Sequence, residues 1–258
     1  MSESQTHHPH SHAAAAPEPE KALDIREKGG AKNGQPQFLD RRLFMQLTAF
    51  TGAGDAKILA QALADAHLEG VVYEDACDPR GAAVLSFSEN ADDLLAKYRP
   101  LFNRAPFAAL TVKPEYSMLG RTYAIGYEPS LEDTLLARPR RVVLDPAWRW
   151  AVWYPLRRTG AFSQLSHQEQ GQILKEHGTI GRQFGDADLA KDIRLNCTGL
   201  DKNDNDFVIG LIGKDLHPLS ALVQTMRPTQ QTSKYIRNMG PFFVGKAIWQ
   251  SPAPKAAA

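Results

Sequence analysis

The chain has 258 residues, 23% of them charged, and its formal net charge is +1 at pH 7. This length allows one large domain or two small ones with a sizeable core. A near-neutral charge argues against a nucleic-acid-binding protein, because such proteins present a broad basic surface. The sequence has no apolar run of membrane-spanning length and no secretion signal at its start, so we expect a soluble, cytoplasmic protein.

The cysteines and both ends of the chain offer no structural site. Cys77 and Cys197 lie far apart and lack the spacing of a zinc site, so we expect two reduced thiols. Residues 1–36 are rich in His, Ala, Pro, Glu and Gly and show no apolar periodicity, which predicts a disordered tail. Its HHPHSH run could bind a metal ion weakly, although a solvated tail is the simpler interpretation. Residues 251–258 are predicted to form a second disordered tail.

Residues 37–114 are predicted to form the first structural unit. Leu43, Met45, Leu47 and Ala49 alternate along a strand. An apolar stripe along residues 54–70 then predicts a helix, which Gly70 ends. The later elements are strands at residues 70–76 and 82–87, a helix at 91–103 and a strand at 107–112. The order is β-α-β-β-α-β.

The same order recurs in residues 115–250, after a strand predicted at 116–127 and a linker at 131–146. Its elements are a strand at residues 148–156, a helix at 166–184, strands at 191–198 and 206–212, a helix at 215–226 and a strand at 242–249. Two ferredoxin-like units in series indicate an internal duplication. We therefore predict an α+β fold of the dimeric α+β barrel type. Its antiparallel sheets face each other in a closed or nearly closed barrel, the helices lie outside, and a pocket lies between one sheet and the helix at 166–184.

That helix carries one histidine on its apolar face. Ser166 and Glu169 have the spacing of a capping box, which predicts where the helix begins. The stripe that should face the core consists of Ile173, His177, Ile180 and Phe184. A buried imidazole needs a partner. The ordinary interpretation of His177 is a core histidine bonded to a backbone carbonyl, and the alternative is a single axial ligand to a heme iron.

Two strands of the second unit carry further polar candidates. Asp192, Arg194 and Asn196 alternate onto one face of their strand, so they meet the pocket together if that face lines it. An Asp192–Arg194 ion pair without a catalytic role is the ordinary interpretation of the first two. The ordinary interpretation of Tyr154 is a buried aromatic residue whose hydroxyl is satisfied.

Five segments of the chain resemble the chlorite dismutase-like heme proteins, a family that includes the coproheme decarboxylases. They are YPLRR at residues 154–158, KEHGTIGR at 175–182, TGLD at 198–201, MR at 226–227 and GPFFVG at 240–245. The resemblance covers roughly residues 107–249 and is specific in order and spacing. It implies a heme-binding oxidoreductase that uses hydrogen peroxide or another small oxidant. It also implies a homo-oligomer, with a ring of five subunits as the family's usual assembly.

By this resemblance His177 is the proximal ligand of the iron. Tyr154 matches the tyrosine that serves the decarboxylases as a radical relay between the peroxide-oxidised iron and a propionate. Groups that match propionate-holding positions, or that stand in the same pocket, are Arg140, Arg158, Arg227, Thr232 and Leu156. Arginine suits propionates because it binds carboxylates with two parallel hydrogen bonds.

The resemblance implies the oxidative decarboxylation of coproheme to heme b, with coproheme as both substrate and cofactor. Two alternatives remain open: a chlorite dismutase or general heme peroxidase that holds heme b, and a heme carrier or sensor without catalysis. Tyr154 favours the decarboxylase, because chlorite-converting relatives do not need it.

Two departures from the family pattern bear on this choice. Arg158 replaces a lysine and Leu156 a methionine, and arginine does not release a proton near neutral pH as a buried lysine can. Asp192 stands at the distal position, where chlorite-converting members have Arg and many decarboxylases have Gln. Asp192 could act as a base toward bound hydrogen peroxide and would repel chlorite, unless Arg194 is the distal group instead.

Overall fold

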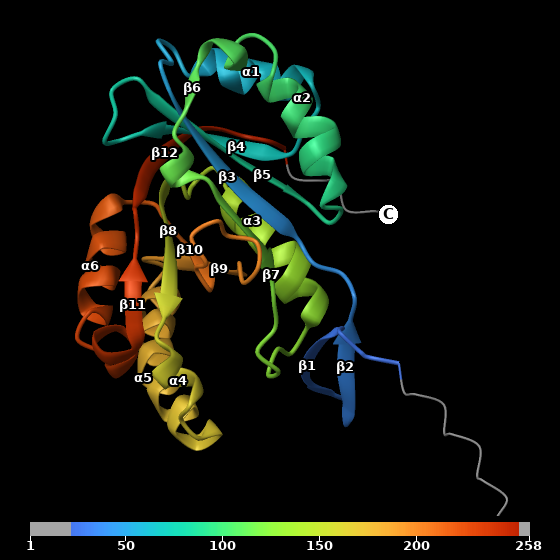
Figure 1. Ribbon diagram of the computed structural model, residues 1–258, viewed down its shortest axis with the longest axis vertical. Helices are drawn as coiled ribbons and strands as arrows, with labels where there is room; N and C mark the ends of the chain where they lie inside the picture. Colours follow the sequence, from blue (N-terminus) through green and yellow to red (C-terminus); the bar gives the residue numbers. More distant parts are fainter. Residues whose placement is uncertain (1–21, 253–258) are drawn as a thin grey trace, which may run out of the picture.

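A computed structural model describes residues 22–252 of the chain. Its centre is a ten-stranded sheet with strand order β10-β9-β7-β3-β5-β4-β12-β8-β11, and β10 also pairs with β8. Because β10 and β8 stand at the two ends of the first eight strands in that order, their antiparallel pairing closes the sheet into a barrel (Figure 1). The predicted α+β barrel is confirmed.

The barrel strands come equally from the two halves of the chain. The first half gives β3 (Phe44–Thr51), β4 (Gly70–Asp75), β5 (Gly81–Ser88) and β7 (Met118–Thr122). The second half gives β8 (Trp150–Arg158), β9 (Lys191–Asn196), β10 (Phe207–Gly213) and β12 (Phe243–Gln250). Two short strands, β6 (Thr111–Val112) and β11 (Ile236–Met239), pair with β3 and β8. Since β7 pairs with β3, the first unit extends beyond residue 114.

Helices cover the outside of the barrel on both halves (Figure 1). The first half carries α1 (Lys57–Asp65), the π-helical turn η1 (Leu94–Tyr98), α2 (Arg99–Phe102) and the 3₁₀ turns η2 (Phe107–Ala109) and η3 (Pro114–Tyr116). The second half carries α4 (Gly160–Ser163), α5 (His167–Asp186), α6 (Leu216–Met226) and the π-helical turn η5 (Gln231–Tyr235). Among residues 22–252, no helix has both the length and the apolar character needed to cross a membrane.

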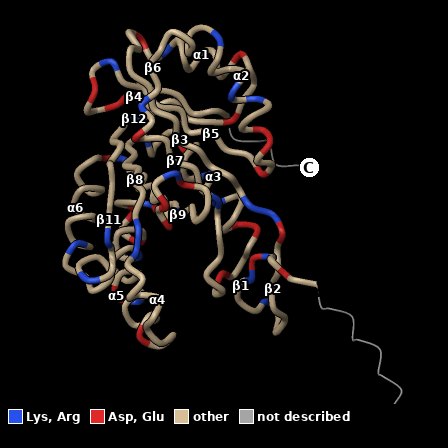
Figure 2. Tube along the Cα trace, in the orientation of Figure 1, with Lys and Arg blue, Asp and Glu red and all other residues tan. Residues whose placement is uncertain are grey.

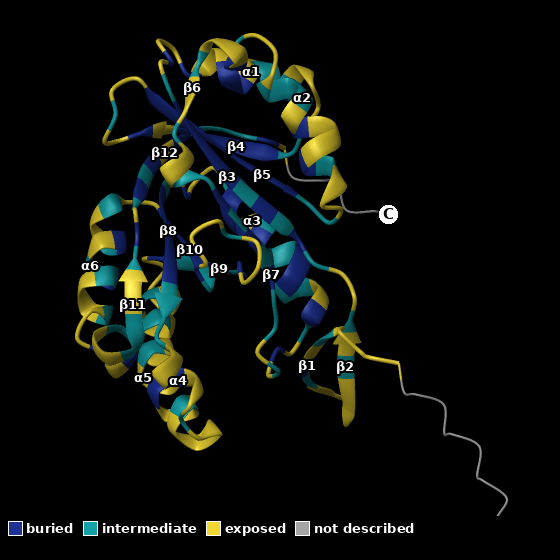
Figure 3. Ribbon diagram, in the orientation of Figure 1, coloured by how far each residue is buried: buried dark blue, intermediate teal, exposed yellow. Residues whose placement is uncertain are grey.

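Alternation along the strands divides the second half into two apolar layers. Inward-facing residues such as Trp153 on β8 and Ile193 on β9 belong to the barrel interior. Outward-facing residues such as Tyr154 on β8 and Leu211 on β10 pack in a separate cluster with residues of α5 and α6. Figure 3 shows the barrel strands such as β3, β5 and β8 as largely buried and the outer helix faces as exposed. The site described below lies in the layer between β8–β10 and α5.

The segment predicted as a linker is helical. Residues 131–146 contain the π-helical turn η4 (Asp133–Ala137) and α3 (Arg138–Leu144). Its apolar side chains join the barrel interior: Leu131, Leu135, Leu136, Val142, Val143 and Leu144. Pro139 lies directly after η4, inside this continuous helical run. The strand predicted at residues 116–127 is limited to β7, and that at 107–112 becomes η2 followed by β6.

The predicted N-terminal tail is wrong for residues 27–36. They belong to a hairpin of β1 (Glu27–Lys32) and β2 (Gln35–Leu39), which extends away from the barrel (Figure 1). Its turn uses positive φ at Asn33 and Gly34, the conformation that an Asn-Gly pair adopts readily. The Glu27 carboxylate ties the hairpin to the end of β7 by accepting hydrogen bonds from Arg121 (2.6 Å) and the Ala124 N–H (2.9 Å).

The remainder of both predicted tails lies largely outside the described residues. The HHPHSH run belongs to residues 1–21 and the last six residues to 253–258, so neither is part of the structure. Ser251, which we assigned to the second tail, is buried and exchanges hydrogen bonds with Gly70, at 2.9 Å and 3.1 Å. The ordered chain therefore extends past the end of β12.

Candidate functional site

The helix α5 presents His177 toward the barrel, as predicted. Ser166 and Glu169 form the expected capping box, in which each side chain accepts a hydrogen bond from the other residue's backbone N–H. On the predicted stripe, Ile173 is buried, and Ile180 and Phe184 pack against the outward face of β8 and β10. His177 shares this stripe, so its imidazole lies between α5 and the sheet.

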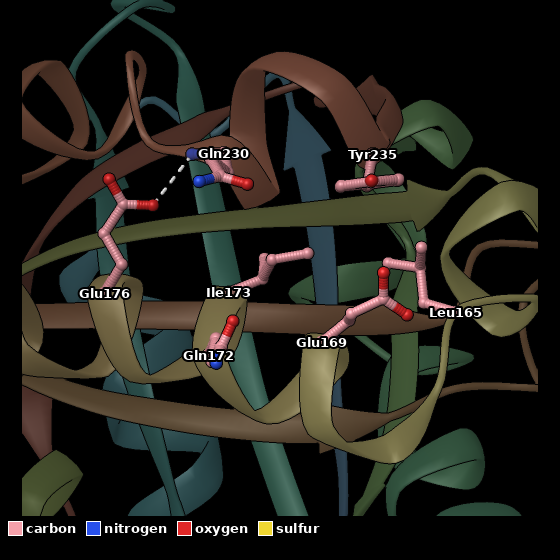
Figure 4. Close-up of a pocket in the computed structure, with 7 residues that line it drawn as sticks. All are labelled: Leu165, Glu169, Gln172, Ile173, Glu176, Gln230 and Tyr235. Atoms are coloured by element: carbon pink, nitrogen blue, oxygen red, sulfur yellow. Dashed lines mark hydrogen bonds between the residues drawn. The ribbon is translucent and has the colours of Figure 1, made fainter.

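The imidazole of His177 makes no hydrogen bond to any residue that the structure describes. Its Nδ1 atom is buried and makes no hydrogen bond to a described residue. Burial lowers the pKa of His177, and the positive charges of Arg158 and Arg194 lower it further. Glu176, the adjacent residue, instead accepts a hydrogen bond from the Gln230 N–H at 3.0 Å (Figure 4). A neutral imidazole is the form that can bind a metal ion.

Three strands bring the other predicted residues to the face that α5 covers. Tyr154 on β8 pairs with Ile209 on β10, which in turn pairs with Arg194 on β9. Paired residues share a face, and so do residues two apart in one strand, which places Asp192 on this face too. Ile209 and Tyr154 pack in the same cluster as Ile180 and Phe184. The structure thus assembles His177, Tyr154, Asp192 and Arg194 around one layer.

Tyr154 is buried but its hydroxyl is unused. The side chain is 5% exposed and stacks on Phe242, with ring centroids 4.5 Å apart. Its hydroxyl makes no hydrogen bond to any residue from 22 to 252. Burial raises the pKa of Tyr154, as does the charge of Asp192, while Arg227 opposes the shift. The phenol is therefore protonated at neutral pH.

The carboxylate of Asp192 lies between two guanidinium groups. Arg138 contacts Oδ1 at 3.1 Å, and the Nε of Arg194 contacts Oδ2 at 3.1 Å. The predicted ion pair with Arg194 is present, and Arg138 adds a second cation. Figure 2 shows positive and negative positions meeting near β9.

Arg158 makes no ion pair within the described chain, although the Asp206 carboxylate accepts a hydrogen bond from the Arg158 backbone N–H at 2.7 Å and its charge acts on the guanidinium. The guanidinium of Arg158 lies 4.5 Å from the ring centroid of Phe162 and 4.8 Å from that of Phe207. Its Nε is buried without a hydrogen-bond partner, and burial lowers the pKa of the group. A hollow of about 310 Å³ opens beside it, lined in part by Gln170 and Thr198. A carboxylate from a ligand would satisfy this guanidinium.

The remaining assigned residues differ in how close they lie to this group. Leu156 is buried on the same face of β8, paired with Phe207. Arg227 directly follows the last residue of α6, and its positive charge lowers the pKa of Tyr154. The hydroxyl of Thr232 lies 3.3 Å from that of Thr229. Arg140 lies apart from them and pairs with Glu69 at 3.4 Å and Glu89 at 3.5 Å, both from the first half of the chain.

The structure adds two residues that the sequence did not indicate. Tyr123 lies just after β7, and its ring centroid is 5.6 Å from that of Phe207. Burial raises the pKa of its hydroxyl, and the positive charges of Arg194 and Arg158 oppose this rise. Arg138 reaches Asp192 from α3. Neither residue stands in a motif, and each fell in a segment whose secondary structure was predicted differently. Only the three-dimensional arrangement could place them.

The residues present fit a porphyrin with an iron centre. Of the seven buried side-chain polar atoms that lack a partner in the described chain, five lie on β8, α5 and η5 or directly beside them. One of the five, Trp153 Nε1, belongs to the barrel interior, and the other four lie near α5. They are Arg158 Nε, Thr159 Oγ1, His177 Nδ1 and Gln231 Oε1. A second hollow, of about 300 Å³, lies between α5 and η5 (Figure 4). Buried polar atoms that lack hydrogen-bond partners and cluster around one helix indicate a binding site for a polar ligand.

Comparisons with known proteins agree with this fold. A heme-binding protein from Thermus thermophilus is 20% identical, with 80% of this chain and 91% of that one covered and a TM-score of 0.63. A protein described as a putative chlorite dismutase is 15% identical (81% and 95% covered, TM-score 0.64). A variant of the chlorite dismutase from Candidatus Nitrospira defluvii is 14% identical (82% and 92% covered, TM-score 0.61). At these identities the likeness shows a shared fold.

The sequence itself matches a described family. No curated protein matches the chain. The family described as chlorite dismutase matches residues 78–248, which include every element of the site from Tyr123 to Thr232. This match spans well over half of the sequence. The chain therefore belongs to the chlorite dismutase family.

Proposed function

We propose that this protein is a heme-dependent oxidoreductase that decarboxylates coproheme to heme b with hydrogen peroxide. The observation that carries the proposal is Tyr154, whose ring is buried on the sheet face that α5 covers and whose hydroxyl makes no hydrogen bond to any residue between 22 and 252. This hydroxyl is not among the buried polar atoms that lack a partner, so it is accessible to a ligand. A solved relative of the same fold is described as a heme-binding protein, which supports an iron porphyrin as the ligand.

The chain's own groups suit coproheme. His177, neutral and unpartnered at Nδ1, would ligate the iron through its other nitrogen. Coproheme carries four propionates, and Arg158 and Arg227 are cations that would hold carboxylates. Arg158 supports this most strongly, because it lies between two rings, buries an unpartnered Nε and makes no ion pair within the described chain.

The bound iron would supply the oxidising power once peroxide reacts with it. For each propionate the balance is one carboxylate side chain, one hydrogen peroxide and one proton giving one vinyl group, carbon dioxide and two waters. Tyr154 would pass a single hydrogen atom from the propionate toward the oxidised centre and be restored afterwards. Its protonated phenol suits this role, since it carries both the electron and the proton.

Arg158 would bind a propionate carboxylate of coproheme, but it would not supply the proton that the reaction consumes. A guanidinium stays charged at neutral pH even where burial lowers its pKa. Solvent is the source we propose for this proton, because the side chain of Arg194 is 47% exposed at the edge of the site.

One observation favours a second candidate, conversion of chlorite by a permanently bound heme b. We expected the negative charge of Asp192 to repel chlorite. Two guanidinium groups flank that carboxylate, so the local charge is positive and a small anion is not repelled. A general peroxidase or a heme carrier would show neither reaction. Cytoplasmic location and assembly into a homo-oligomer remain part of the proposal.

The test is to load the protein with ferric coproheme, titrate hydrogen peroxide and follow the porphyrin by mass spectrometry. We expect loss of two carboxyl groups in the parent and in Tyr127→Phe, whose exposed ring lies outside the site. Tyr154→Phe should bind coproheme with the parent's affinity and leave its mass unchanged. Unchanged mass in the parent, beside oxygen release from chlorite, would instead establish the second candidate. Bound porphyrin without either reaction would indicate a carrier.

A further inference from the structure

The segment between β11 and β12 contains a β-bulge opposite Tyr154. Both strands pair with β8, and the register of that pairing differs by one residue on the two sides of the segment. Residues 240–242 therefore face only Tyr154 and Pro155 of β8. The Gly240 N–H donates to the Pro155 carbonyl at 2.8 Å, which fixes the segment against β8. Bulges of this kind often redirect a side chain next to an active site.

The bulge is followed by Phe242, which lies flat against the ring of Tyr154. The two ring centroids are 4.5 Å apart, and the ring planes differ by 23°. The next residue, Phe243, belongs to the barrel interior, whereas Phe242 and Tyr154 share the outer cluster that packs against α5 and α6. Stacked aromatic rings attract each other beyond the burial of their apolar surface. The stack therefore restrains the ring of Tyr154.

Gly240 leaves the space that this stack needs. A Cβ at Gly240 would lie 3.1 Å from a ring carbon of Phe242, which is closer than most real contacts. The φ angle of Gly240 is +106°, a conformation that residues with a side chain rarely adopt. Alanine at this position would strain the backbone and push the Phe242 ring aside. The glycine and the first phenylalanine of the GPFFVG segment thus act together on Tyr154.

The stack leaves the hydroxyl of Tyr154 free for a ligand. The ring is buried and one of its faces lies against Phe242, while the hydroxyl makes no hydrogen bond to a residue between 22 and 252. A phenol that is held by its ring keeps its hydroxyl in place without a hydrogen bond to the protein. A bound ligand can then be the partner of that hydroxyl.

We propose that Phe242 is a positioning residue, which holds the phenol of Tyr154 so that its hydroxyl meets a propionate of the bound porphyrin. Gly240 supports this role by leaving room for the Phe242 ring. This inference rests on the proposed function, because transfer of a hydrogen atom through Tyr154 requires a fixed geometry. A displacement of about 1 Å at a reacting group can slow a reaction about a hundredfold.

The first test measures the stack in the full chain without porphyrin. The ring resonances of Tyr154 are identified in ¹H–¹³C NMR spectra by their loss in Tyr154→Phe. In the parent we expect them to be shifted upfield by the ring current of Phe242. They should move toward the positions of an exposed tyrosine in Phe242→Leu and in Gly240→Ala. Phe242→Tyr keeps a flat ring and should retain the upfield shift.

The matched control is Phe243→Leu, the same change at the next residue. The ring of Phe243 lies in the barrel interior, with its centroid 6.1 Å from that of Tyr73 and 6.2 Å from that of Tyr116. This substitution should lower the stability of the fold and leave the Tyr154 resonances at their parent positions. If it moved them as far as Phe242→Leu does, general loosening would explain the effect and the assignment would be wrong.

The second test measures the rate of the first decarboxylation, with ferric coproheme and hydrogen peroxide, by rapid quenching and mass spectrometry. Phe242→Leu and Gly240→Ala should slow it at least about tenfold, because the phenol is misplaced. The dissociation constant of coproheme should stay close to the parent's in both variants. Phe242→Tyr should recover most of the parent's rate, and Phe243→Leu should keep it.

Failure of this inference differs from failure of the proposed function. If the parent decarboxylates coproheme and Phe242→Leu does so equally fast, the positioning role is refuted and the proposed function stands. A parent that leaves coproheme intact refutes the proposed function, and the first test then still decides whether Phe242 holds the Tyr154 ring. Unchanged Tyr154 resonances in Phe242→Leu would overturn the inference whatever happens to coproheme.

Discussion

At the scale of single residues, the site depends on polar groups that the protein leaves unsatisfied. His177 and Arg158 each bury a nitrogen that has no partner among the described residues, and the hydroxyl of Tyr154 makes no hydrogen bond to any residue between 22 and 252. The histidine could be predicted because it interrupts an apolar stripe, and the tyrosine because it stands in a recognisable segment. Arg138 could not, because its importance comes from a contact with a residue 54 positions away in sequence.

The two cysteines give a residue-level prediction on pH. Burial raises the pKa of Cys197 to about 12, and its thiol donates to the Asn205 carbonyl at 3.1 Å. A raised pKa keeps the thiol protonated, so Cys197 should stay unreactive toward Ellman's reagent from pH 7 to 9, because only the thiolate attacks. Cys77 is exposed and should react rapidly.

The measurement is the number of fast-reacting thiols in the native protein. We expect one in the parent, none in Cys77→Ser and two in the parent after denaturation. Two fast thiols in the native state would show that Cys197 is accessible and that the β9–β10 turn opens readily.

At the scale of elements, α5 is the helix whose start and buried face were predicted best from the sequence. Its capping box marks where it begins, and its stripe shows which face is buried. The segment before the second half was described worst, because the apolar residues of 131–146 lie among arginines and a proline that obscure their helical spacing. The same segment supplies Arg138, so the error in the element hid a residue of the site.

The capping box of α5 should be measurable in stability. Ser166→Ala removes the side chain that caps the Glu169 N–H, which should lower the free energy of unfolding by about 1 kcal/mol. Ser163→Ala is the control, since Ser163 is exposed in α4 and caps nothing there. Denaturant titration followed by circular dichroism measures both. Equal stability of the two variants would mean that the start of α5 contributes little to the fold.

At the scale of the whole molecule, one strand pair converts an open sheet into a barrel. The sequence predicted the order of elements in both units, and hydrophobic alternation predicted which strand faces would be buried. Two features escaped it. The β1–β2 hairpin is mostly polar and is held by contacts with residues near the end of β7. The pairings of β4 with β12 and of β7 with β9 depend on how the two units meet.

The closing pair can be tested at Gly210. A Cβ there would lie 2.5 Å from the ring of Trp153 on the paired strand, closer than real contacts allow. Gly210→Ala should therefore destabilise the protein by about 1–3 kcal/mol, the usual effect of overpacking. Gly171→Ala has open space on α5 and should stabilise it by about 0.5–1 kcal/mol, because alanine favours a helix.

Thermal and denaturant unfolding distinguish these variants. The expected order of stability is Gly171→Ala, parent, then Gly210→Ala. A Gly210→Ala protein as stable as the parent would contradict the tight packing of Trp153 across the β8–β10 pair.

The most direct measurement for the whole account is the iron coordination of His177. Ferric coproheme is titrated into the parent, into His177→Ala and into His167→Ala, an exposed histidine on the same helix, and optical and electron paramagnetic resonance spectra are recorded. We predict a histidine-ligated spectrum for the parent and for His167→Ala. For His177→Ala we predict its loss, with recovery on adding imidazole. A histidine-ligated spectrum that persists in His177→Ala would contradict the account.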